Sequence, residues 1–524
     1  MTASTDSNMP TENDYDQVPY PQMTHAHSHP RHLEAIATLF GMRPEPVPNA
    51  RVLELGCASG TNLMPIALDY PESQCLGIDL SERQIADGQL AAKTLGLENL
   101  ELRHADMMEI DASWGRFDYI LCHGVYSWVA PAVQEKILAI CKENLASRGV
   151  AMVSYNVLPG WHFRGMIRDL MLYHTAQFDQ PGEKVSQARA IVKFMAENCV
   201  EETPYGQMFR GELESLCSAD DDYLIHDHLE RENNPVYFSQ FVERAAGCGL
   251  QYLGDTKFAS MLPRFVSEGA NEALKNAPLV KQEQYMDFLR NRTFRRTLLC
   301  HQTEVLTRGL TPRVLQPFQI VLASRPSEVP IDLADRQPLD LSVGDGRIST
   351  NSPAGKAAIA QLIESWPRAV SLDELRQQVI ERLRAASLAP DSQSGLDQLP
   401  EAMLNAFICG ALDVYIHPPR VAADRAACPR ASRLAQQQAA CGPQVTNQRH
   451  EMVNLDPLSL HVLERLGGDS PWQQLRERII QEAVDGRIPL ARSGQPTADM
   501  VTSGLPEMVD RALVGLDGNA LLCP

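Results

Sequence analysis

Long apolar runs are absent from this 524-residue sequence. Every apolar stretch is interrupted well before the roughly 18 residues that a membrane-spanning helix needs, so no membrane insertion is expected. The polar, acidic start at residues 1–17 lacks the basic and apolar regions of a secretion signal, which predicts a cytoplasmic protein. With 44% hydrophobic and 22% charged residues, the composition is that of an ordinary globular protein.

Cysteine pairs at metal-binding or redox spacing are also missing. The twelve cysteines are scattered, and none forms a C-x2-C or C-x4-C pair. Buried free thiols are therefore expected rather than a disulfide framework or a zinc site. The histidines at positions 25, 27, 29 and 32 fit neither one helix face nor a zinc loop, so no metal site is predicted.

Positive charge is scarce. Lys and Arg number 47 against 66 Asp and Glu, which gives a net charge of −19. Such a surface repels phosphate backbones and attracts cationic partners. Nucleic acid is therefore not expected as a substrate.

Residues 51–156 alternate between apolar runs and amphipathic stretches. The runs RVLEL, QCLGID, LELRHA, FDYILC and GVAMVSY are typical of strands joined by helices. This pattern predicts a parallel, doubly wound α/β sheet whose ligand crevice lies at the carboxyl ends of the strands. Two later runs, at 250–258 and 317–324, are expected to complete seven strands.

The sequence divides into a core with additions. We expect an N-terminal segment and lid helix at 1–48, a nucleotide-binding core at 49–160 completed by 249–258 and 317–325, and helical insertions at 161–248 and 259–316. Mainly helical, winged-helix-like C-terminal units are expected at 327–420 and 443–524, joined by a linker at 421–442. A short repeat, SLDELRQQVIERL (371–383) against PWQQLRERIIQEA (471–483), motivates the two units. They contain no cofactor motif, so we expect them to select a partner.

The segment VLELGCASG (52–60) is the strongest functional signal. Glycines at 56 and 60 let the backbone turn sharply from a strand into a helix and approach a ligand closely. Acidic residues stand at three successive strand ends: Glu54, Asp79 and Asp106. Asp79 is placed to accept hydrogen bonds from ribose hydroxyls, and Asp106 from an adenine amino group.

Glu54 distinguishes between two cofactors that use this fold. Its carboxylate would repel the pyrophosphate of a dinucleotide, but it suits a sulfonium with an α-amino group. S-adenosylmethionine (SAM) is therefore the expected cofactor. The alternative is that Glu54 and Asp79 are only strand-end and helix-start charges. The complete set of cofactor candidates is Glu54, Gly56, Ala58, Gly60, Asn62, Asp79, Leu80, Gln84, Asp106, Met107 and His123.

Four segments carry a resemblance to a known family. LELGCASGTNLMPIAL, GIDLSERQIADGQ, FDYILCHGVYSWV and SYNVLPGWHFRGMIRDLM resemble class I SAM-dependent methyltransferases with a methyltransferase regulatory domain, a group that includes rickettsial protein-lysine methyltransferases. The likeness covers about residues 15–325 and implies a seven-stranded class I methyltransferase core. Ala58 stands where a glycine is usual in this family.

The acceptor site is expected beyond strands four and five. Tyr126, Trp128 and His123 follow the fourth strand, Asn156 ends the fifth, and Tyr20 of the N-terminal segment is expected to close over them. Aromatic faces attract a methylated ammonium, and amide and phenol oxygens can orient an amine. Ordinary packing remains the alternative for Tyr126 and Trp128, and a structural role the alternative to a general base for His123.

These observations favour a methyltransferase that acts on lysine side chains of proteins. An acidic chain suits a basic, lysine-bearing protein partner. Two alternatives stay open: methylation of a small metabolite, and a SAM-binding regulatory or scaffold protein whose terminal units recruit partners. The sequence predicts no particular oligomeric state.

Overall fold

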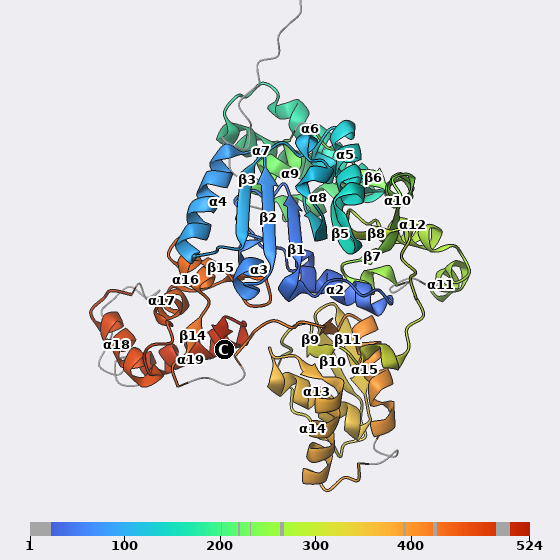
Figure 1. Cartoon of the computed structure of the whole chain (residues 1–524). Coiled ribbons are helices and arrows are strands. Elements are labelled where there is room, and N and C mark those ends of the chain that lie inside the picture. Colours follow the sequence, from blue (N-terminus) through green and yellow to red (C-terminus); the bar gives the residue numbers. More distant parts are fainter. Residues whose placement is uncertain are drawn as a thin grey trace, which may run out of the picture.

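A mixed β-sheet forms the centre of the molecule, in the order β3-β2-β1-β4-β5-β8-β7 (Figure 1). The computed structural model describes residues 22–200, 202–217, 221–230, 232–262, 267–327, 329–390, 395–422, 427–488 and 504–524. The strands are β1 (Arg51–Leu55), β2 (Gln74–Asp79), β3 (Leu100–His104), β4 (Phe117–Cys122), β5 (Leu145–Leu158), β7 (Leu250–Asp255) and β8 (Phe294–His301). β1 to β5 pair in parallel, whereas β8 runs antiparallel to β5 and β7. The predicted seven-stranded doubly wound core is confirmed.

The identity of the last strand corrects the sequence prediction. β8 completes the sheet, whereas 317–325 contributes β9 (Gln319–Leu322) to a separate antiparallel sheet, β12-β9-β13. Residues 259–316 were expected to form a helical insertion, yet they include β8 with its two adjacent arginines, Arg295 and Arg296. Arg295 is nevertheless fully buried, because acidic side chains pair with it.

Helices cover the sheet and also make up most of the segments inserted between its strands. The covering helices are α2 (Pro30–Leu39), α3 (Met64–Asp69), α4 (Glu82–Leu95), α5 (Pro131–Glu143) and α10 (Phe238–Gly247). Between β5 and β7 the chain inserts α6 (Gly160–Thr175), α7 (Pro181–Asn198), α8 (Pro204–Cys217), α9 (Asp221–His228) and the short β6 (Val236–Tyr237), which pairs with β5. α11 (Glu268–Leu274) and α12 (Leu279–Arg290) lie between β7 and β8.

Two further units follow the sheet (Figure 1). The first comprises β9, β10 (Leu339–Val343), β11 (Gly346–Thr350), α13 (Pro353–Ser365), β12 (Val370–Ser371), α14 (Leu372–Ala385), α15 (Leu399–Ile408) and β13 (Leu412–Tyr415). The second comprises β14 (Arg430–Ala431), α16 (Arg433–Ala439), β15 (Gln444–Thr446), β16 (Met452–Asn454), α17 (Pro457–Arg465), α18 (Trp472–Val484), α19 (Leu505–Gly518) and β17 (Leu522–Cys523). The repeated sequences form α14 and α18. The segment 421–442 is more than a linker, since it supplies β14 and α16.

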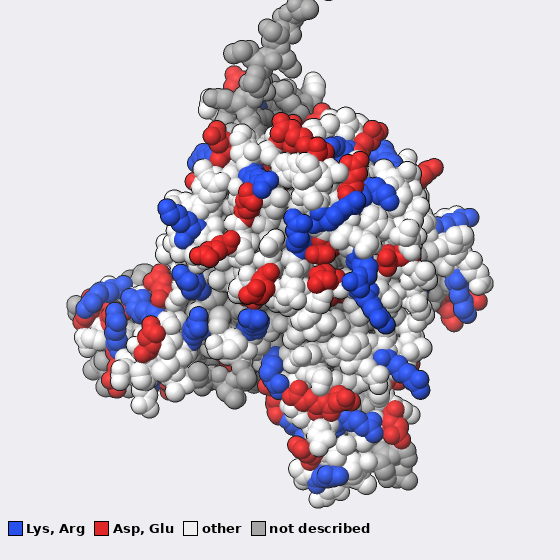
Figure 2. Space-filling view, viewed as in Figure 1, with Lys and Arg blue, Asp and Glu red and all other residues white. Residues whose placement is uncertain are grey.

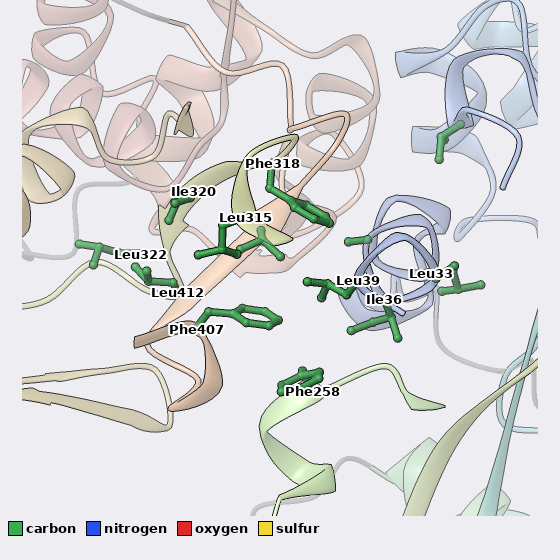
Figure 3. Packing of buried hydrophobic residues seen from close by; sticks show 14 of the residues in the cluster. Leu33, Ile36, Leu39, Phe258, Leu315, Phe318, Ile320, Leu322, Phe407 and Leu412 are labelled. Carbon is green, nitrogen blue, oxygen red and sulfur yellow. The ribbon is translucent and has the colours of Figure 1, made fainter. Parts of the chain in front are cut away.

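Helix α2 joins the sheet to the first C-terminal unit. Pro30 occupies its first turn, and Gly41 follows its end with φ +87°. Its buried Leu33, Ile36 and Leu39 belong to one apolar cluster with residues of both parts (Figure 3). The labelled partners in that cluster are Phe258, Leu315, Phe318, Ile320, Leu322, Phe407 and Leu412. The helix that was expected to be a lid, α2, is therefore buried between the sheet and the first C-terminal unit.

Charges of both signs are interspersed over the face shown in Figure 2. The acidic surplus of the sequence is not gathered into one patch on that face. Within the described ranges, no helix has the length and apolar character required to cross a membrane.

A buried ion cluster ties α12 to β8. Arg295 Nη2 donates to Glu283 Oε2 at 2.8 Å and to Asp287 Oδ1 at 2.7 Å, and the guanidinium lies 4.0 Å from the centre of the Phe238 ring. Asp255 Oδ2, at the end of β7, lies 3.7 Å from Arg295 Nη1. Burial raises the pKa of Asp287, while the charge of Arg295 opposes that rise.

We expect Asp287→Ala to lower the free energy of unfolding by about 3–5 kcal/mol, because it leaves a buried guanidinium without its main partner. Chemical denaturation measures the change. Glu101→Ala is the matched control, since it breaks the exposed pair with Arg103 and should cost less than about 1 kcal/mol. Equal losses in the two variants would contradict a stabilising role for the buried cluster.

Candidate active site

The turn after β1 is built from residues with left-handed backbone. Gly56, Ala58 and Gly60 have φ of +70°, +50° and +71°. Alanine tolerates this region at a cost of about 1–2 kcal/mol, so Ala58 keeps the turn that glycine usually provides. The amides of Gly56 and Cys57 both donate to the Ile78 carbonyl at 2.9 Å, which anchors the turn to β2.

The three predicted acids have different environments. Asp79 Oδ2 accepts from the Ala58 amide at 2.8 Å and Oδ1 from the Ser81 amide at 2.9 Å, so this carboxylate links β2 to the glycine turn. Asp106 instead accepts from the Met108 amide and begins a short 3-10 helix. Glu54 is buried near the end of β1.

Glu54 has an incompletely satisfied carboxyl group. Its Oε1 accepts from Asn62 Nδ2 at 2.7 Å, whereas its buried Oε2 has no hydrogen-bond partner among the described residues. Burial raises the pKa of Glu54 to about 8, against the lowering effect of the Asn62 hydrogen bond. A cationic ligand group at Oε2 would compensate for this burial.

A cavity of about 300 Å³ opens at these strand ends. Most of the predicted cofactor residues line it: Glu54, Gly56, Ala58, Asn62, Asp79, Leu80, Gln84, Met107 and His123. Gly60 and Asp106 are not among the described residues of its wall. Gly60 instead permits close packing, because a Cβ there would lie 2.6 Å from Leu102 Cδ2.

Only part of the predicted acceptor site reaches this cavity. His123 and Trp128 line it. Tyr126 is fully buried in the core beside Phe241, with ring centres 5.2 Å apart. Asn156 donates its side-chain amide to Asn233 at 3.1 Å and is not part of the described wall. Tyr20 lies outside the described residues.

The structure adds wall residues that the sequence analysis did not assign. Gln22, Met23 and His25 come from the N-terminal segment, and His226 from α9. The His25 and His123 rings lie 3.9 Å apart. Burial lowers the pKa of His25 to about 4 and that of His123 well below 6.5, with the positive charge of Arg296 adding to both shifts. Both imidazoles are therefore neutral near pH 7.

Asn62 also connects the cavity to the second C-terminal unit. Its Oδ1 lies 2.8 Å from Nε2 of His450, 388 positions later in the chain. The clustered histidines at 25–32 were visible in the sequence only as a rejected metal pattern, and nothing in the sequence pointed to His450. No three His, Cys, Asp or Glu side chains are grouped to hold a metal ion within the part of the chain that the structure describes.

Comparison with known proteins agrees with this geometry. Residues 46–212 match a methyltransferase domain, 220–301 a predicted methyltransferase regulatory domain, and 428–521 the C-terminal winged helix domain of PKMT. An uncharacterized protein of Rickettsia prowazekii is 34% identical over 92% of this chain and 88% of its own length. A second one is 40% identical over 44% of this chain and 93% of its own length.

A solved structure corresponds to nearly the whole chain. PKMT2 from Rickettsia typhi, in complex with S-adenosylhomocysteine, is 32% identical, with a TM-score of 0.88 over 96% of this chain and all of that one. The fold and the site define a class I methyltransferase whose cofactor is SAM. Within that class, the chain belongs to the PKMT family with a methyltransferase regulatory domain and a C-terminal winged helix domain.

Gly88 allows α4 to pack against the glycine turn. A Cβ at this position would overlap the Ser59 carbonyl and lie 2.8 Å from Leu102 Cδ1. We expect Gly88→Ala to lower the free energy of unfolding by about 1–3 kcal/mol and to weaken S-adenosylhomocysteine binding, because the turn must move. Thermal unfolding and calorimetry measure both effects.

Gly165→Ala is the matched control. Gly165 also lies in a helix, α6, but a Cβ there would meet nothing within 4 Å. This variant should be unchanged or slightly more stable, because alanine has the higher helix propensity. Full cofactor affinity in Gly88→Ala would contradict tight packing of α4 on the turn.

Proposed function

We propose that this chain transfers methyl groups from SAM to lysine side chains of proteins. The observation that carries the proposal is the near-complete correspondence with PKMT2, a protein-lysine methyltransferase by name, which extends through the PKMT winged helix domain. A lysine-bearing protein is therefore the proposed partner.

The cavity residues fit the parts of the cofactor. Asp79 ends β2 in the cavity wall, where its carboxylate oxygens suit the ribose hydroxyls as hydrogen-bond acceptors. Glu54 Oε2 suits the α-ammonium group, which would supply the missing partner. The apolar side chains of Leu80 and Met107 suit the adenine ring. When bound, SAM supplies a methyl group on a positively charged sulfur.

The histidine and tryptophan side chains of the cavity wall favour a neutral amine. A lysine side chain must lose a proton before its nitrogen can attack, against an ordinary pKa of about 10.4. The half-buried, neutral rings of His25 and His123 and the indole of Trp128 give a poorly hydrated wall, and removal from water favours the uncharged amine. His123 Nδ1 has no partner in the described parts of the chain, so it is available to accept a hydrogen bond from the acceptor nitrogen.

Mass spectrometry tests the reaction. The full chain is incubated with SAM and lysine-containing proteins, and we expect mass increments of single methyl groups on lysine side chains. Increments confined to small metabolites, or to residues other than lysine, would overturn the proposal.

Trp128→Ala tests the acceptor wall. We expect turnover to fall about 10²-fold, because the amine is no longer held in line with the methyl group, while S-adenosylhomocysteine affinity is retained. Trp114→Ala is the control, since Trp114 packs beside Arg103 away from the cavity. Parental turnover in a folded Trp128→Ala protein would place the acceptor elsewhere.

The raised pKa of Glu54 predicts a pH dependence. Because the folded chain holds the proton of Glu54 more tightly, this carboxyl group contributes fully to the free energy of unfolding below about pH 4.5. The contribution is lost as the pH rises to about 8. The cationic ligand needs the ionised carboxylate, so below pH 8 binding must release a proton. We expect S-adenosylhomocysteine affinity to rise up to about tenfold per pH unit from pH 6 to 8.

Calorimetry at several pH values measures this slope. Glu54→Gln should bind more weakly and lose the dependence, because the amide does not titrate. The same slope in both proteins would assign the titration to another group.

A further inference from the structure

A buried loop of the second C-terminal unit reaches the cofactor turn. In the loop Asn447–Glu451, the Arg449 guanidinium donates to Asp413 at 2.9 Å and to the Ala323 carbonyl at 3.1 Å, both near the first unit's sheet. The Gln448 amide donates to the Ala520 carbonyl at 2.9 Å, and the Gln448 carbonyl accepts from Arg31 of α2 at 3.3 Å. The loop is thus held from three sides.

His450 projects from this loop into the core. It is fully buried, and its backbone has φ +67°, a left-handed region that is uncommon outside glycine but that histidine, asparagine and aspartate adopt more often than other residues. Its ring meets the edge of the His29 ring, with centres 4.9 Å apart. Its Nε2 lies 2.8 Å from Asn62 Oδ1. A strained, buried contact of this kind persists only when its surroundings fix it.

The hydrogen bonds around Asn62 fix the direction of this contact. The His25 backbone amide, which can only donate, lies 3.0 Å from Asn62 Oδ1. That oxygen is therefore the acceptor, and Asn62 Nδ2 faces Glu54 Oε1 at 2.7 Å and Ser28 Oγ at 3.0 Å. Burial lowers the pKa of His450 well below 6.5, so the neutral ring donates through Nε2. His450 thus orients the amide that holds the Glu54 carboxyl.

We propose that His450 is a positioning residue through which the winged-helix unit sets the affinity of the cofactor site, by orienting Asn62 and, through it, Glu54. The inference rests on the proposed placement of the cofactor's α-ammonium group at Glu54. It makes the C-terminal unit part of the cofactor site, although 388 positions separate the two hydrogen-bonded side chains.

A double-mutant cycle on the full chain tests this inference. The variants are His450→Asn, Asn62→Ala and the double variant, and calorimetry measures S-adenosylhomocysteine affinity. Asparagine tolerates the positive φ but is too short to reach Asn62. We expect His450→Asn to weaken binding about tenfold, through one lost hydrogen bond and a misdirected amide.

The energetic coupling between the two substitutions distinguishes a His450 that positions Asn62 from one that only supports the fold. If His450 acts through Asn62, the double variant should bind no more weakly than Asn62→Ala alone. In His450→Gln, the side-chain amide nitrogen can occupy about the position of the histidine Nε2. This variant should recover most of the S-adenosylhomocysteine affinity. Additive losses in the cycle, or no loss in folded His450→Asn, would overturn the inference.

His417→Asn is the matched control. His417 also joins a C-terminal unit to α2, with Nδ1 2.9 Å from the Glu34 carboxylate, but it is not part of the described cavity wall. Its S-adenosylhomocysteine affinity should stay at the parental value, and a loss equal to that of His450→Asn would contradict a specific role for His450. The readout is binding alone, so an absence of lysine methylation would overturn the proposed function without affecting this result.

Discussion

Burial of helix α2 is the constraint on which the arrangement of the parts depends. Its apolar side chains pack in a cluster shared by the sheet and the first C-terminal unit, including Phe258 and Phe407, whose rings lie 5.0 Å apart. Exposing the apolar side chains of this cluster to water would cost a large free energy. The sheet and the first unit are therefore packed as one body, and the chain before α2 is held at the strand ends.

This constraint assembles the cavity from distant segments. The strand ends provide Glu54 and Asp79, the segment before α2 provides His25, and the insertion provides His226. The second C-terminal unit reaches the same place through His450, because its loop is anchored to α2 and to the first unit. Partner selection by the C-terminal units stays a prediction, and the contact between His450 and Asn62 adds a proposed structural role at the cofactor turn.

The differences between expectation and structure have a common origin. β8 lies in a segment that was expected to be a helical insertion, and the burial of its Arg295 depends on pairing with Glu283 and Asp287 from α12. Tyr126 was expected at the acceptor site, yet it faces the core beside Phe241, because the short helix after β4 turns it inward. Trp128, two residues later, does reach the cavity.

The sequence by itself determined the strand–turn–helix with its glycines, the acids at the ends of β1 and β2, and hence the class of fold and its cofactor. These features are local: backbone preferences and apolar periodicity act over a few residues. Only the tertiary structure decided which strand completes the sheet, which ring faces the cavity and that His450 contacts Asn62. Such choices depend on contacts between different elements, up to 388 positions apart for Asn62 and His450, which no local pattern encodes.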